Sequence, residues 1–213
     1  MGKRTNPQKG VTVMYIIFAV IIVLLVLMLI INNVVFMRVE VSGTSMYSTL
    51  NDGDVVVASK KAKARRGDII VIDKVKITGT DEEGKAEYAY LIKRLIATAG
   101  DTVVFRADGL YLKKHGESEF SLVSDAVLSG GLDGGFFKEG EETVIGENQI
   151  FYIGDNVTNS YDSRHYGTTD KKNIVAVVPK WAVSCRKFTT FTVKKIISPV
   201  RSFFQGKSCK GNG

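Results

Sequence analysis

The chain has 213 residues, of which 45% are hydrophobic and 24% charged. This composition excludes a disordered chain, a collagen and a transporter with many membrane spans. The two cysteines, Cys185 and Cys209, cannot build a disulfide framework or a four-ligand zinc site. The two histidines, His115 and His165, leave little for a histidine-based site, so we expect neither a metal nor a cofactor.

The formal net charge of +7 is unevenly distributed. Residues 1–31 carry three basic side chains and no acid, residues 32–170 carry 16 basic and 22 acidic ones, and residues 171–213 carry ten basic ones and no acid. Anionic lipid attracts basic segments beside a hydrophobic anchor, so a membrane surface is the favoured partner. Nucleic acid is the competing partner of a basic chain, and it would require salt-dependent binding of the tail to DNA.

The run 11–31 contains 21 residues without a charge, a proline or a glycine. A helix of that length is roughly 31 Å long and matches a hydrocarbon core of about 30 Å. A cleaved leader has a shorter apolar region and a small-residue cleavage site, which this run lacks. We predict a transmembrane helix over residues 11–32. Because basic residues are more frequent before the run, the basic segment 1–10 is expected in the cytoplasm and the rest of the chain outside.

After the anchor, short apolar runs alternate with Gly, Asp and Asn, which predicts a mainly β fold. The predicted strands are Asp54–Ser59, Asp68–Ile72, Tyr88–Ala97, Thr102–Phe105, Gly109–Leu112, Gln149–Ile153, Ile174–Val178 and Trp181–Cys185. We assign residues 33–105 and 148–185 to an all-β catalytic domain. Residues 106–147 are rich in Gly, Glu and Ser and predict a small inserted β subdomain or a long loop. The polar stretch 79–87 predicts a hairpin tip, and residues 186–213 form a basic C-terminal tail.

Ser45 and Lys93 are the first two candidate site residues. Ser45 lies just after the anchor, among hydroxyl residues and a glycine, next to bulky side chains. Lys93 interrupts an apolar strand, where it shares a face with Leu91 and Leu95. If that face is buried, desolvation lowers the pKa of the lysine and makes it a competent general base. An exposed edge strand, with Lys93 and Arg94 both reaching water, is the alternative.

A polar segment over residues 154–167 follows the predicted strand Gln149–Ile153. Within it, Asp162 and Arg164 are two residues apart, so they can face the same way and form an ion pair. Arg94, on the opposite strand face from Lys93, needs a carboxylate partner. Such a density of polar side chains after an apolar strand favours a functional site, and a plain polar turn is the alternative.

Together these segments resemble the bacterial type I signal peptidases, and they are most similar to the compact Gram-positive enzymes. The resemblance covers the anchor and the motifs Ser-Gly-Thr-Ser-Met-Tyr-Ser-Thr-Leu (42–50), Arg-Gly-Asp-Ile-Ile-Val-Ile (66–72), Ile-Lys-Arg-Leu-Ile (92–96), Gly-Asp (100–101), Gly-Asp-Asn (154–156) and Ser-Tyr-Asp-Ser-Arg (160–164). Each motif alone is weak, whereas their order behind a membrane span is specific. The resemblance implies a membrane-bound serine endopeptidase that removes N-terminal signal peptides after Ala-x-Ala-like sites.

The resemblance also implies the role of each site residue. Ser45 would be the nucleophile, whose backbone N–H also binds the oxyanion, and Lys93 would be the general base. Ser160 would orient the lysine. The structural support would come from Asp155, Asp162, Arg164 and Arg94, and the substrate pocket from Val41, Met46, Leu50 and Leu91. The substrate would be a signal-peptide-bearing pre-protein, added as an extended strand; no nucleic acid and no obligate protein partner are implied.

Three positions depart from the family pattern. Ser48 stands where the family commonly has Pro, Thr98-Ala99 where it has Leu-Pro, and Val157 where it has Arg. These departures suggest a divergent or specialised member. A non-catalytic or specialised surface or pilus assembly factor on the same scaffold is the alternative function. Such a protein would be expected to lose the serine or the lysine, whereas Ser45 and Lys93 are both present.

Overall fold

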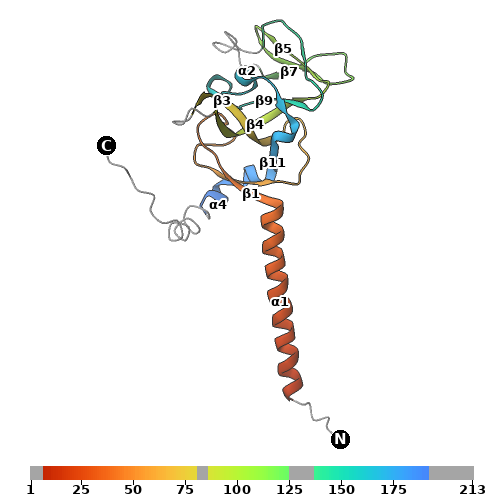
Figure 1. Cartoon of the computed structure of the whole chain (residues 1–213), viewed down its shortest axis with the longest axis vertical. Helices are drawn as coiled ribbons and strands as arrows, with labels where there is room; N and C mark the ends of the chain where they lie inside the picture. Colours follow the sequence, from red (N-terminus) through yellow and green to blue (C-terminus); the bar gives the residue numbers. More distant parts are fainter. Residues whose placement is uncertain (1–6, 81–85, 125–136, 192–213) are drawn as a thin grey trace, which may run out of the picture.

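The computed structural model describes residues 7–80, 86–124 and 137–191, and it consists of a long helix that leads into a β domain (Figure 1). Helix α1 (Pro7–Val35) includes the segment Val11–Val35, which is long and apolar enough to cross a membrane, with a mean hydropathy of 3.4. None of its apolar window is buried inside the domain. The predicted helix is therefore present and ends slightly later than expected.

Two antiparallel sheets make up the β domain among the described residues. The larger sheet has the strand order β1-β2-β11-β3-β4-β9-β10. Its strands are β1 (Phe36–Glu40), β2 (Val55–Ser59), β3 (Ile69–Thr80), β4 (Ala86–Thr98), β9 (Gln149–Ile153), β10 (Thr169–Asp170) and β11 (Ile174–Val178). The smaller sheet has the order β7-β6-β5-β8 and lies at the end of the domain away from α1 (Figure 1). Its strands are β5 (Thr102–Arg106), β6 (Gly109–Lys113), β7 (Ser121–Ser124) and β8 (Thr143–Val144).

The remaining elements are short helices on the loops and after the last strand. They are η1 (Val157–Asn159), α2 (Ser163–Tyr166), η2 (Lys171–Asn173), α3 (Lys180–Ser184) and α4 (Arg186–Phe191). The mainly β fold is thus confirmed, and all but one of the predicted strands are present. Strands β1, β7, β8 and β10 were not predicted, because they are short or lack a continuous apolar run.

The prediction of a strand over Trp181–Cys185 is wrong, because helix α3 occupies this segment. Strand β11 ends at Val178, and Pro179 follows as the N-cap of α3 with φ −68°. Proline cannot donate a hydrogen bond to a sheet, and its fixed φ suits the start of a helix. The helix buries Ala182 in the core and leaves Trp181 and Cys185 exposed.

The smaller sheet begins earlier than the insertion predicted over residues 106–147. Strand β5 pairs with β6 along Thr102–Arg106 and with β8 at its start, so it belongs to the smaller sheet and not to the larger one. The two sheets share one cluster of buried side chains, in which Phe105, Phe137 and Phe151 contact one another edge-on or tilted. This packing firmly attaches the smaller sheet to β9. The domain bounds otherwise remain a prediction.

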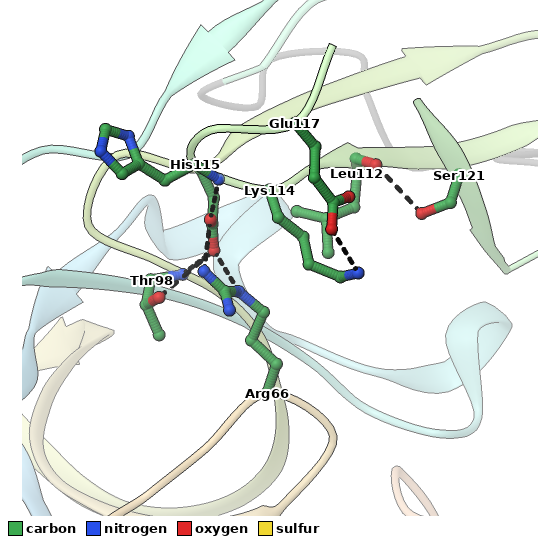
Figure 2. Close-up of polar contacts among 8 residues, drawn as sticks. Arg66, Thr98, Leu112, Lys114, His115, Glu117 and Ser121 are labelled. Atoms are coloured by element: carbon green, nitrogen blue, oxygen red, sulfur yellow. Dashed lines mark hydrogen bonds and ion pairs between the residues drawn. The ribbon is translucent and has the colours of Figure 1, made fainter. Parts of the chain in front are cut away.

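Asp101, in the turn between β4 and β5, joins three separate segments. Its partners Arg66, Thr98 and His115 are labelled in Figure 2. Its carboxylate accepts hydrogen bonds from the backbone N–H groups of Thr98 and His115, both at 2.8 Å. Two nitrogens of Arg66 bind the same carboxylate, each at 2.6 Å. The Asp101 side chain is fully buried. Burial opposes its ionisation, but these hydrogen bonds hold the pKa of Asp101 below its ordinary value.

Some predicted features lie outside the described residues. The hairpin tip falls partly on residues 81–85, although Thr80 and Ala86 are paired on either side of it. Cys209 and most of the basic tail fall within residues 192–213, and part of the basic N-terminal segment within residues 1–6.

We expect Asp101→Ala to lower the free energy of unfolding by about 2–3 kcal/mol, because it leaves the part-buried N–H groups of Thr98 and His115 and the guanidinium of Arg66 without an acceptor. Urea unfolding of the full chain in detergent at pH 7 measures this loss. Glu117→Ala is the matched control, because the ion pair of Glu117 with Lys114 is exposed and contributes little to stability. Equal effects of the two substitutions would contradict a linking role of Asp101. The contribution of Asp101 requires its ionised form, so it should disappear as the pH falls through the lowered pKa.

Candidate active site

Ser45 lies in a turn between β1 and β2 that is anchored on both sides. Gly43 starts the turn with φ +82°, a conformation that favours glycine, and its N–H donates to Asp52 Oδ1 at 2.8 Å. The backbone N–H of Leu50 donates to the carbonyl of Met46 at 2.8 Å. Met46 and Leu50 have no exposed surface, so their side chains fix the turn in the core. Ser45 itself remains partly exposed.

Lys93 lies in β4, which is an interior strand between β3 and β9. Its register partner on β3 is Ile70, which is fully buried. Leu95, on the same face of β4, is 1% exposed, and Lys93 itself is 4% exposed. The alternative of an exposed edge strand is therefore wrong. The strand face that carries Lys93 is buried, which is the condition under which the lysine was expected to act as a general base.

The Nζ atom of Lys93 lies 2.5 Å from the Oγ atom of Ser45. Burial lowers the pKa of Lys93 from 10.5 to about 8. The carboxylates of Asp162 and Asp155 oppose this shift, and the guanidinium of Arg164 adds to it. An amine with this pKa is partly neutral near physiological pH, and the neutral form can accept the hydroxyl proton of Ser45.

Two ion pairs lie near Ser45 and Lys93, the pair called the dyad below. Arg94 binds Asp155 with Nε–Oδ1 at 2.6 Å and Nη2–Oδ2 at 2.5 Å, so Asp155 is the carboxylate partner that Arg94 was expected to need. Arg164 binds Asp162 at 2.9 and 3.0 Å, as the spacing predicted, and both side chains are buried. Each guanidinium also donates to backbone carbonyls, Arg94 to Gly67 and Arg164 to Val157. The pairs therefore connect the loop after β9 to the neighbouring backbone.

Ser160 is buried near the turn that carries Ser45 and is not hydrogen-bonded to Lys93 within the described part of the chain. Its Oγ atom has no hydrogen-bond partner within the described part of the chain. Ser160 lies against Gly154, where an added Cβ would collide with Ser160 Oγ and with the carbonyl oxygen of Ser45. Gly154 thus permits the loop after β9 to approach the turn that carries Ser45, which is called the nucleophile turn below. Orientation of the lysine by Ser160 remains a prediction.

The four predicted pocket residues are not brought together. Val41, Met46 and Leu50 belong to one core cluster and are at most 2% exposed, so they cannot contact a substrate in this conformation. Leu91 is partly exposed and packs against a different cluster. The side chains of the three core residues anchor the turn instead of facing the solvent. The assignment of all four residues to a substrate pocket stays a prediction.

Three polar residues at the site received no role from the sequence, namely Thr44, Asn156 and Asn159. Asn156 and Asn159, on the loop after β9, donate hydrogen bonds to Thr44, the residue before the candidate nucleophile. Asn156 belongs to the Gly-Asp-Asn motif, which is the one signal that singled it out. In the described ranges, no group of three or more His, Cys, Asp or Glu side chains is arranged to hold a metal ion.

This arrangement is suited to nucleophilic catalysis by a serine. A hydroxyl is a weak nucleophile near pH 7, and an adjacent base that removes its proton activates it. A desolvated lysine at hydrogen-bond distance supplies that base without a histidine. The backbone N–H of Ser45 is a donor next to the attacking oxygen, where an oxyanion would form.

Comparisons with known proteins identify the family. The family model described as "Signal peptidase, peptidase S26" matches residues 13–181. Signal peptidase I V of Bacillus subtilis is 32% identical over 152 residues, which cover 70% of this chain and 86% of that protein. Signal peptidase I of Bacillus caldolyticus is 34% identical over 152 residues, which cover 68% of this chain and 78% of that protein. A crystal structure of a signal peptidase I from Enterococcus faecalis matches with a TM-score of 0.35 and 22% identity, covering 55% of this chain and 98% of that one.

The family model spans most of the chain, and the two Bacillus relatives are matched over more than two thirds of their length. The resemblance inferred from the ordered motifs is thereby confirmed. The chain belongs to the type I signal peptidases of peptidase family S26.

Proposed function

We propose that this signal peptidase cleaves exported pre-proteins after Ala-x-Ala-like sites, with Ser45 as the nucleophile and Lys93 as the general base. The observation that carries the assignment is the 2.5 Å contact between Ser45 Oγ and the Nζ atom of a lysine that is 4% exposed. Neither residue alone would suffice. Ser45 needs a base, and Lys93 needs burial to be neutral.

The reaction proceeds through an acyl-enzyme in this proposal. Ser45 Oγ attacks the scissile carbonyl carbon while its proton passes to Lys93 Nζ, and the Ser45 N–H binds the oxyanion. The C–N bond then breaks, and the Lys93 ammonium gives its proton to the leaving amine. A water molecule next loses a proton to Lys93 and attacks the ester. The Lys93 ammonium then returns a proton to the oxygen of Ser45 as the ester C–O bond breaks and the signal peptide leaves.

We further propose that residues 1–10 lie in the cytoplasm and the β domain on the outer face of the membrane. The asymmetry of basic residues around α1 supports this orientation. Strand β1 follows α1 without a linker, because α1 ends at Val35 and β1 begins at Phe36. The β domain is therefore held at the membrane, where the apolar segment of a signal peptide resides.

The same end of the domain has an aromatic and basic surface formed by α3 and α4. Trp181 and Phe191 are each 53% exposed, and Phe188 is 73% exposed. Lys180 and Lys187 are exposed beside them. Helix α4 is held to β2, whose Val55 N–H donates to Thr190 Oγ1 at 2.7 Å, and it lies beside β1 at the end of α1 (Figure 1). Exposed aromatic rings among basic side chains favour an anionic membrane interface, so we propose that this surface contacts lipid.

Cleavage of a synthetic signal peptide with an Ala-x-Ala site, by the full chain in detergent or lipid, tests the proposed reaction. Ser45→Ala and Lys93→Ala should each lower kcat by about 10³-fold or more, because the nucleophile or its base is removed. Ser42→Ala, immediately before the same turn, is the matched control and should leave cleavage unchanged. Cleavage that survives Ser45→Ala would refute the dyad. A folded wild-type chain that cleaves no such peptide would favour the assembly-factor alternative.

The pH dependence of kcat/KM should report the deprotonation of Lys93. Since the neutral amine is the base, activity should be low in acid, rise with pH and reach half of its plateau near pH 8. Peptide cleavage from pH 5 to 10 measures this profile, with the unfolding temperature recorded over the same range as a control. A midpoint near 10 would indicate a solvated lysine, and one near 4 would indicate a carboxylate base.

Trp181 is the single tryptophan of the chain, so its fluorescence reports on the α3–α4 surface alone. In vesicles that contain anionic lipids brominated near the headgroup, we expect strong quenching of this emission. Quenching should weaken when the anionic lipid is replaced by a zwitterionic one. Efficient quenching by aqueous acrylamide, with none by brominated lipid, would contradict lipid contact.

A further inference from the structure

Asn156 contacts both carbonyl groups that flank the Cα atom of Ser45. Its side-chain Nδ2 donates to the carbonyl oxygen of Thr44 at 3.1 Å. Its backbone N–H donates to the carbonyl oxygen of Ser45 at 2.9 Å. A third bond, from Asn159 Nδ2 to Thr44 Oγ1 at 2.6 Å, joins the same two segments. The nucleophile turn is thus held from the opposite side of the site by the loop after β9.

The bond to Thr44 has a consequence for the neighbouring N–H group. The peptide between Thr44 and Ser45 is planar and trans, so its C=O and its N–H point in opposite directions. Fixing the Thr44 carbonyl therefore fixes the direction of the Ser45 N–H, the donor assigned to the oxyanion. The Tyr47 N–H also binds this carbonyl, at 3.1 Å, but Tyr47 belongs to the turn and moves with it.

The loop that holds Asn156 is itself firmly attached. The Gly154 N–H donates to the buried Asp162 at 3.1 Å, and Asp155 is bound by Arg94. The hydroxyl of Thr158 donates to Asn156 Oδ1 at 3.1 Å. This last bond occupies the amide oxygen and directs Nδ2 toward Thr44. Asn156 lies on the loop after β9, and β9 pairs with β4, the strand that carries Lys93. The hydrogen bonds of Asn156 therefore connect the Thr44–Ser45 peptide to the strands that position Lys93.

We propose that Asn156 is a positioning residue that aligns the Ser45 N–H with the oxyanion by fixing the Thr44–Ser45 peptide plane. The role rests on the proposed function of Ser45. Asn156 acts through the backbone of the turn, by its hydrogen bonds to the carbonyl groups of Thr44 and Ser45. Its effect belongs to the transition state, where the oxyanion exists, and not to substrate binding.

The test compares Asn156→Ala and Asn156→Asp with the wild-type chain in cleavage of the same signal peptide. Aspartate has the size of asparagine but cannot donate to the Thr44 carbonyl when ionised. Both variants should lower kcat roughly tenfold to hundredfold and leave KM within about twofold. In Asn156→Ala the midpoint of the pH profile should stay near 8, because this variant changes no charge near Lys93. The aspartate variant adds a negative charge beside Asp155, which favours the ammonium form of Lys93, so it is compared by kcat on the high-pH plateau.

Asn173→Asp is the matched control, because it makes the same chemical change at another position. The side-chain amide of Asn173 donates to Thr169 Oγ1 at 3.1 Å, in β10. It should leave kcat unchanged. Thr158→Val provides a milder variant that keeps Asn156 and removes the hydroxyl that orients its amide. We expect a smaller decrease in kcat, again with the wild-type pH midpoint.

Several results would overturn this role. Full activity of Asn156→Asp would show that the residue only fills space. A rise in KM at constant kcat would assign Asn156 to substrate binding. A pH midpoint of Asn156→Ala moved toward 10 would show general disruption of the lysine site. Failure of the wild-type chain to cleave any such peptide would instead refute the proposed function, and with it this role of Asn156. If wild type cleaves and Asn156→Ala cleaves equally well, only the positioning role fails.

Discussion

The burial of the Lys93 amine beside Ser45 is the constraint on which the rest of the site depends. An ammonium ion removed from water is costly, and the group responds by a lowered pKa. With 4% of the side chain exposed and a pKa of about 8, Lys93 can exist neutral at physiological pH. The same residue on an edge strand would remain protonated and could not activate Ser45. The position of β4 between β3 and β9 is therefore as much a part of the chemistry as the lysine itself.

The charged groups near Lys93 are arranged in pairs. Arg94 binds Asp155, and Arg164 binds Asp162, so the site contains two guanidinium–carboxylate pairs around one titratable amine. A buried pair in which one partner is removed leaves an uncompensated charge, which is strongly destabilising. These pairs also fix the loop after β9, from which Asn156 reaches the Ser45 turn. Val157, which stands where the family has Arg, packs against the core and offers its carbonyl to Arg164. The loop is thus held without that arginine.

The placement of the site follows from how the domain is attached. Helix α1 continues directly into β1, β1 pairs with β2, and the turn that carries Ser45 connects these two strands. Ser45, the proposed nucleophile, is consequently separated from helix α1 by a single strand. The aromatic and basic surface on α3 and α4 is supported by β2 as well. The same hairpin therefore supports the apolar helix, the proposed nucleophile and the surface proposed to contact lipid. This arrangement fits the proposed cleavage of substrates that arrive in the membrane.

The sequence by itself determined the apolar helix, most of the strands and the identity of the dyad candidates, because these depend on local patterns and on motifs in a fixed order. It misassigned Trp181–Cys185, where Pro179 outweighed an apolar composition. It could not separate apolar residues that line a site from those that anchor it, and the structure places Val41, Met46 and Leu50 in the core. Only the tertiary structure decided that Lys93 is buried, that Arg94 is paired with Asp155 and that Asn156 holds the Ser45 turn. These contacts join residues 48 to 112 positions apart. Strand pairing brings them together, and no local pattern in the chain records such a pairing.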